Sequence, residues 1–294
     1  MFAVVDWPSN LGLRPSGVEA LPSALRRAGL LSRLRARDAG SVSPQADYDP
    51  QRSAETGVLN GPALREAAHS LAQAVARVIE RDEVPIVLAG DCSVILGGLL
   101  ASRIAAHSRV ALLFIDGHVD FYQPEASPTG EVADMDLAIA TGRGPSILTE
   151  LAADAPLVRD EDVVAIGARD ASEREKADSQ DIRATQITLL ELPAIRQRGI
   201  TAVADDALKV VARDDLPGFW CHLDADVLDD AVMPAVDYRQ DGGMTPAELT
   251  ELLRRAGNSG RMIGFSVAIY NPALDPSGDG ARLLVEILDH AFAH

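Results

Sequence analysis

The chain has 294 residues, of which 47% are hydrophobic and 24% charged, which is typical of a folded globular protein rather than a disordered one. Its formal net charge of −17 disfavours nucleic acids and anionic membranes as partners, because both repel an acidic protein. No apolar run of about 18 residues and no signal-peptide pattern occurs, and two cysteines cannot form a disulfide framework, so we expect a cytoplasmic protein.

Short apolar runs alternate with longer helical patterns along the chain. The short runs are continuous rather than alternating, as expected of parallel strands that are buried on both faces. We predict strands over residues 3–5, 86–89, 110–115, 163–166, 219–223 and 262–269. We predict helices over residues 64–81, 94–107, 205–212, 246–256 and 282–290, with Pro62 and Pro246 near two of the starts and Thr245 as a cap.

This alternation of strands and helices predicts an α/β fold with a doubly wound, mainly parallel sheet. The composition does not divide the chain, so residues 1–294 are expected to form one domain. Residues 40–61 are rich in Ser, Pro, Asp and Gly, which favours a surface connection over a lid above a site. No G-x-G-x-x-G pattern follows a predicted strand, which argues against a dinucleotide-binding enzyme.

Acidic residues follow three of the predicted strands. Because parallel strands end at the same edge of a sheet, we expect these segments to converge in one crevice. Four carboxylates and an imidazole cannot share a crevice unless cations neutralise them, and with a thiolate they suit one or two divalent transition metals. The predicted metal-binding residues are Cys92, Asp116, His118, Asp120, Asp224 and Asp226.

Each motif taken alone also has an ordinary structural interpretation. The pair Asp224 and Asp226 could cap a helix or lie in a solvated loop, and Cys92 could be a small core residue. The D-x-H-x-D pattern of residues 116–120 is more specific, since alternation would turn its three polar side chains to one side of an extended chain. The combination of the motifs in this order indicates a metal site.

The ordered motifs resemble those of the ureohydrolases, the family of arginases, agmatinases and their relatives. Residues 90–93 are similar to the family's G-G-D-H-S motif, residues 116–120 to D-A-H-x-D, and residues 222–243 to S-x-D-x-D-x-L-D-P…P…G-G. Further similarities lie in residues 17–30, 124–130, 166–170 and 271–275. The resemblance therefore covers nearly the whole chain.

The resemblance implies a three-layer α/β/α fold with two divalent metal ions, manganese first, at the strand ends. In the family a hydroxide that bridges the metals attacks the central carbon of a guanidinium, and two such ions lower the pKa of bound water. By position, Asp116 and Asp224 would bridge the metals. The other implied ligands are Cys92 and Asp120 for one ion and His118 and Asp226 for the second.

Several positions depart from the family pattern. Cys92 replaces a histidine, and its softer thiolate makes zinc or iron alternatives to manganese. Ala133 replaces the histidine that shuttles protons in arginases, and Ile269 replaces the glutamate that pairs with the guanidinium. The implied substrate-binding positions are Tyr122, Thr129, Glu131, Ser172, Glu175 and Ile269, of which only Thr129 and Glu175 are similar to the family's residues. L-Arginine is therefore disfavoured as the substrate.

Other residues could supply the missing acid/base group. His222 replaces a serine, two residues before Asp224 and on the same strand face, although it could equally be a buried structural histidine. Glu131 is a second candidate, either as an acid/base or as an anchor for a cation. The candidate catalytic residues are therefore His222, Glu131 and, beside the metals, Asp120.

The leading hypothesis is a metal-dependent hydrolase that cleaves a C–N bond in a guanidino-, hydroxyguanidino- or amidino-type small molecule. In having a cysteine at position 92 and no shuttle histidine, the sequence resembles the hydroxyarginine hydrolases of antibiotic biosynthesis. The alternative is an inactive protein of the same fold that binds metal or a partner, which Ile269 and Ala133 favour. A small-molecule substrate is the expected partner, and a homo-oligomer is compatible with the sequence.

Overall fold

The computed structural model describes residues 1–292, and within them one parallel sheet of eight strands forms the centre of the molecule. The strand order is β2-β1-β3-β8-β7-β4-β5-β6. The strands are β1 (Phe2–Trp7), β2 (Arg37–Ser41), β3 (Val84–Ala89), β4 (Ala111–Ile115), β5 (Val163–Ile166), β6 (Thr188–Leu190), β7 (Phe219–Asp224) and β8 (Met262–Ala268). The predicted α/β fold with a parallel sheet is confirmed.

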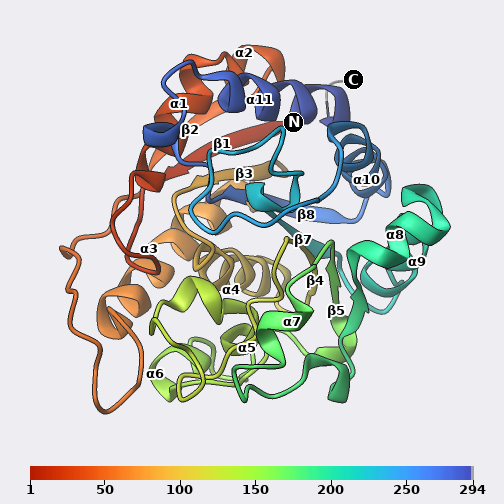
Figure 1. Cartoon of the computed structure of the whole chain (residues 1–294). Helices are drawn as coiled ribbons and strands as arrows, with labels where there is room; N and C mark the ends of the chain where they lie inside the picture. Colours follow the sequence, from red (N-terminus) through yellow and green to blue (C-terminus); the bar gives the residue numbers. More distant parts are fainter. Residues whose placement is uncertain (293–294) are drawn as a thin grey trace.

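Helices cover both faces of this sheet and complete the three layers (Figure 1). On one face, α3 (Gly61–Ile79) and α4 (Val94–Ala106) pack together and against the central strands. On the other face lie α1 (Leu21–Arg27), α9 (Ile200–Val211), α10 (Pro246–Asn258) and α11 (Asp279–Phe292). Shorter helices are α2 (Leu30–Arg33), α5 (Asp136–Ala140), α6 (Ser146–Thr149), α7 (Ala171–Arg174) and α8 (Leu192–Arg198).

The two faces of β7 show why its sequence is apolar throughout. Trp220 lies against Gly98 of α4, where a Cβ atom would collide with the indole ring, so close packing requires glycine. The next residue, Cys221, faces the opposite layer, because its register partner Phe265 contacts Phe292 of α11 with ring centroids 5.3 Å apart. His222 and Asp224 therefore share the α4 face of the sheet with Trp220.

The predicted starts of α4 and α10 are confirmed, whereas α3 and α11 begin three residues earlier than predicted, at Gly61 and Asp279. Thr245 caps α10 in a capping box, with its side chain accepting a hydrogen bond from the Glu248 amide at 3.2 Å, and Pro246 opens the helix. Helix α9 begins earlier than predicted, at Ile200 directly after Gly199. Residues 42–60 form neither helix nor strand, as expected of a connection. No described helix combines the length and apolar character that a bilayer crossing requires.

Candidate active site

The turn between β3 and α4 places Cys92. Gly90 passes so close to the carbonyl of Ser9 that any Cβ atom would collide with it. Buried Asp91 holds the turn by accepting hydrogen bonds from the amides of Gly12 at 3.2 Å and Ser93 at 3.0 Å, and burial raises the pKa of Asp91 to about 6. Cys92 is completely buried, and its thiol donates to Asp224 across a distance of 3.0 Å.

The segment after β4 brings three polar side chains together. The strand ends at Ile115, and the Asp116 carboxylate accepts a 2.7 Å hydrogen bond from the His118 amide, which turns the chain. Asp120 has a left-handed backbone with a φ of 45°. Donor atoms of Asp116, His118 and Asp120 lie within 4.8 Å of one another. The predicted convergence is right, but a turn produces it rather than the alternation of an extended chain.

The end of β7 is joined to this turn by hydrogen bonds. Asp224 accepts a 2.6 Å hydrogen bond from the amide of Asp226. Asp226 accepts one at 3.0 Å from the amide of Gly117, and its other oxygen lies 2.9 Å from His118 Nδ1. A side chain at position 117 would collide with Asp226 and with Arg169, so this contact requires glycine. The ends of β4 and β7 therefore form one rigid unit.

The third segment completes the cluster, because donor atoms of Cys92, Asp116 and Asp224 also lie within 4.8 Å of one another. Burial and the neighbouring Asp226 raise the pKa of Asp116 to about 7, and burial raises the pKa of Asp224 well above its usual range. Among the described residues, Asp116 Oδ2 finds no hydrogen-bond partner. This crowded acidic donor set fits divalent cations. All six predicted residues converge, and their role as ligands stays a prediction.

His118 and Asp226 are paired as ions. Burial alone would lower the pKa of His118, but the charges and hydrogen bonds of Asp226 and Asp116 raise it well above the ordinary value. Burial would likewise raise the pKa of Asp226, but His118 lowers it. A metal bound at His118 would have to displace this proton, because only the neutral imidazole is a ligand.

An acidic cleft lies above the cluster. His118, Asp120, Asp224 and Asp226 form part of its lining. The predicted positions Tyr122, Thr129, Glu131, Ala133 and Ile269 line it as well. Further carboxylates that the sequence reasoning did not single out are those of Asp134, Asp170 and Glu173. The cleft therefore favours cationic groups, from metals or from a substrate.

Among the predicted substrate-binding and catalytic residues, three lie outside the lining of the cleft. Ser172 and Glu175 are exposed on and just after α7, and Glu175 pairs with Arg183 at 3.5 Å, whereas Glu173 between them lines the cleft. Ser172 and Glu175 therefore do not line this cleft, and their role in substrate binding stays a prediction. His222 is completely buried beneath the cleft.

Glu131 is held by partners on both carboxylate oxygens. Oε1 accepts a 3.1 Å hydrogen bond from the amide of Arg14, and Oε2 accepts one of 2.7 Å from the hydroxyl of Tyr238. Tyr238, which the sequence reasoning missed, also lines the cleft. With both oxygens engaged, Glu131 is better placed to build the wall of the cleft than to move a proton.

Ile269 supplies an apolar and rigid part of the lining. Its φ of 71° lies in the left-handed region, which is exceptional for a β-branched residue. Its amide donates a 2.9 Å hydrogen bond to the carbonyl of Gly90, which fixes the end of β8 to the turn that carries Cys92. The side chain is 5% exposed and offers no charge to a bound cation.

Asp136 is the residue of the site that sequence reasoning missed most clearly. It opens α5, is completely buried, and lies with Cys92 and His222 in a group whose donor atoms are within 4.8 Å of one another. The available signal was a carboxylate directly before the apolar run of residues 137–140.

The fold and the site together define an arginase-like α/β protein. Residues 2–293 match the arginase family model, and the chain belongs to the arginase family. It is 29% identical over 296 residues to the arginase of Staphylococcus aureus (strain MRSA252), covering 98% of this chain and 96% of that protein.

Solved structures agree with this assignment. The arginase of Bacillus caldovelox superimposes with a TM-score of 0.88 at 28% identity, covering 100% of this chain and 98% of that one. The agmatine ureohydrolase of Thermoplasma volcanium shares the fold, with a TM-score of 0.72 at 19% identity over 99% of this chain and 88% of that one.

Proposed function

We propose that this protein is a metal-dependent hydrolase that cleaves a C–N bond of a guanidino-, hydroxyguanidino- or amidino-type small molecule other than L-arginine. Membership of the arginase family supports the reaction type. The observation that carries the proposal is the convergence of the predicted metal ligands beneath an acidic cleft. Both cysteines are free and buried, which fits a reducing, cytoplasmic setting.

The predicted ligands would hold two divalent ions, for which manganese is the first expectation. Asp116 and Asp224 would be shared by both ions, His118 and Asp226 would complete the set for one ion, and Cys92 and Asp120 the set for the other. Bound divalent ions at this position supply an activated water and stabilise the charge that develops on the substrate. The contacts of Asp226 with Gly117 and His118 orient the ligands in advance.

The lining of the cleft supports a substrate whose reacting end is less cationic than a guanidinium. A guanidinium beside two metal ions needs an anion to offset desolvation and repulsion, and Ile269 supplies none. Ala133 cannot transfer a proton, and His222 lies beneath the lining, so a leaving group that needs less help from a protein acid is favoured. A hydroxylated, less basic guanidine meets both conditions.

The test is a side-by-side assay of L-arginine, N-hydroxy-L-arginine and agmatine with protein loaded with Mn²⁺ or Zn²⁺, measuring urea or hydroxyurea release. We expect turnover of a substrate other than L-arginine, loss of that turnover in Asp116→Asn, and retention in Asp214→Asn, a change at an exposed carboxylate. Turnover of L-arginine at an ordinary rate, about 1–10³ per second, would refute the substrate proposal. Metal binding without turnover of a wider set of guanidino and amidino compounds would favour the inactive alternative.

A further inference from the structure

A second group of potential ligands lies behind the predicted metal pair. Cys92, Asp136 and His222 come from the turn after β3, the start of α5 and the middle of β7. All three side chains are completely buried, and their donor atoms lie within 4.8 Å of one another. In the family pattern given above, Asp136 and His222 are not ligand positions.

The polar atoms of this group lack the hydrogen bonds that burial normally requires. In the part of the chain that the structure describes, neither carboxylate oxygen of Asp136 has a partner, and neither has Nε2 of His222. The thiol of Cys92 donates to Asp224 and not to these two residues. Buried polar atoms without partners are unfavourable, and a shared cation would satisfy all of them at once.

The imidazole of His222 is oriented as a ligand would be. Its Nδ1 lies 2.8 Å from the hydroxyl of Ser266, which also accepts a 2.9 Å hydrogen bond from the indole N–H of Trp220. A hydroxyl oxygen has two lone pairs, so Ser266 can accept from both rings. In the tautomer in which Ser266 accepts from both rings, Nδ1 carries the proton and Nε2 presents its lone pair, which is the arrangement that outer partners impose on metal-binding histidines. The stacked ring of Phe114, with centroids 5.3 Å apart, also restricts the imidazole.

The donor set and its spacing point to the kind of ion. Zinc binds sulfur at about 2.3 Å and nitrogen or oxygen at about 2.0–2.2 Å, so two ligands of a tetrahedral ion lie roughly 3.5 Å apart. Donor atoms within 4.8 Å of one another need to approach by about 1.3 Å at most to reach this geometry. A thiolate, an imidazole and a carboxylate suit zinc better than manganese, which prefers oxygen ligands. Asp224 Oδ2, 3.0 Å from the sulfur, is available as a fourth ligand.

We propose that Cys92, Asp136 and His222 form a buried zinc-type metal site, which shares Cys92 with the ligand set of the family pattern and adds Asp136 and His222 to it. His222 is then a ligand rather than the proton donor considered from the sequence. The inference goes beyond the proposed function, because this ion binds whether or not a substrate is hydrolysed.

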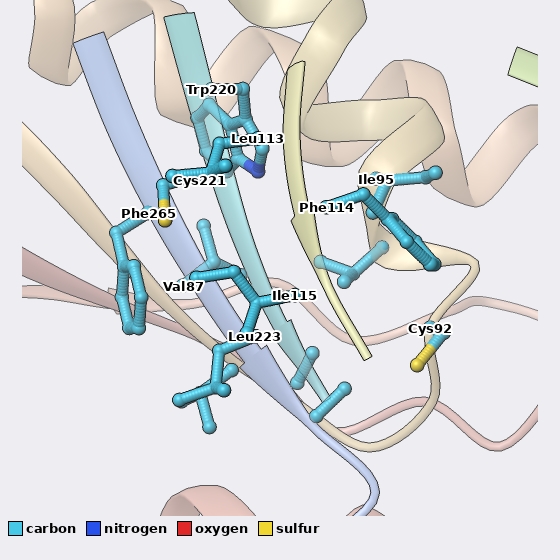
Figure 2. Close-up of a cluster of buried hydrophobic side chains, with 14 of the residues drawn as sticks. Val87, Cys92, Ile95, Leu113, Phe114, Ile115, Trp220, Cys221, Leu223 and Phe265 are labelled. Atoms are coloured by element: carbon cyan, nitrogen blue, oxygen red, sulfur yellow. The ribbon is translucent and has the colours of Figure 1, made fainter. Parts of the chain in front are cut away.

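The test uses the purified full-length protein, stripped of metal with a chelator and titrated with Co²⁺ as a spectroscopic substitute for Zn²⁺. A thiolate bound to Co²⁺ gives a sulfur-to-metal charge-transfer band in the near ultraviolet. We expect this band in the wild type and its loss in Cys92→Ser, Asp136→Asn and His222→Gln. The matched control is Cys221→Ala, since Figure 2 shows Cys221 beside Leu113 and Phe265, with Cys92 apart from them beyond the tip of β4.

Zinc affinity gives the second measurement. Competition with a chromogenic chelator should show a loss of more than about 100-fold in each ligand variant and about 10–100-fold in Ser266→Ala, which removes only the outer partner of His222. Asp136→Asn tests whether misfolding causes the loss of zinc affinity, because it removes a buried charge without changing the shape of the side chain. Its metal-free form should unfold at a temperature no lower than that of the wild type.

Three outcomes would overturn the proposal. One is the absence of the thiolate band in the wild type. Another is survival of the band in either Asp136→Asn or His222→Gln, because Cys92 would then bind metal only with the family's ligands. The third is loss of the band in Cys221→Ala. The expected thiolate band, lost in all three ligand variants, would support this site even if the protein hydrolysed no guanidino compound. That lack of hydrolysis would count against the proposed function alone.

Discussion

Replacing Ile269 with glutamate would introduce a carboxylate into the cleft at the position where the family pairs an anion with the guanidinium. The matched control is Ile269→Gln, which has the same length and the same freedom from β-branching but no charge. Both variants relieve the strain of a β-branched residue at a φ of 71°, so the difference between them isolates the charge.

The expected effect follows from the burial of the site. Two unit charges about 4 Å apart attract each other by about 4 kcal/mol at an effective dielectric constant of about 20. Ile269 is only 5% exposed, so a glutamate there must also lose much of its hydration, which we take to offset roughly half of the gain. The remaining stabilisation of a guanidinium, about 2 kcal/mol, corresponds to about a 30-fold change in kcat/KM.

The assay compares L-arginine with N-hydroxy-L-arginine, which differ only at the reacting end. Relative to the wild type, Ile269→Glu should shift the ratio of the two kcat/KM values toward L-arginine by about 30-fold. Ile269→Gln should leave that ratio within about threefold. If glutamate and glutamine shift the ratio equally, the missing charge at this position does not control selectivity, and the argument against L-arginine fails.

Two further predictions concern stability. Burial raises the pKa of Asp134 to about 6, so the folded protein holds the proton of this carboxyl more tightly than the unfolded chain does. The contribution of Asp134 to the free energy of unfolding therefore falls as the pH rises from about 4 through about 6. Urea unfolding of metal-free protein should show that Asp134→Asn removes this decline, which amounts to about 3 kcal/mol, and an unchanged pH profile would contradict the assignment. Gly98→Ala should lower the free energy of unfolding by about 1–3 kcal/mol, because its methyl group overlaps the Trp220 ring, and an unchanged urea midpoint would show that the indole can move aside.

The buried strands could be predicted from the sequence because continuous apolar runs have few other uses. The edge strands could not: β2 has the sequence RDAGS and is largely exposed, and β6 has only three residues. Edge strands are commonly short and polar, and the energy that orders them comes from pairing with a neighbour rather than from local preference. The order of the strands depends likewise on contacts between segments far apart in the sequence.

The candidate site was predictable where charged residues follow buried strands and unpredictable where single residues arrive from elsewhere. Asp116 and Asp224 were predicted to meet because parallel strands end together. Asp136 and Tyr238 reach the site from α5 and from the loop after β7, and only the packing of those segments shows that they do. Ser172 and Glu175 were expected in the cleft from the resemblance, yet α7 turns Glu173 toward it instead.

The position of β8 in the sheet has a consequence for how the protein is made. This strand is the last of the described strands in sequence, yet it lies between β3, which leads to Cys92, and β7, which ends at Asp224. During synthesis, β3 and β7 have no partner along these edges until residues 262–268 have left the ribosome. Until then the nascent chain exposes two long apolar strand edges, which are prone to pair with other chains. A truncation before Met262 should therefore leave two separate half-sheets that aggregate, rather than a smaller protein with a partly formed site.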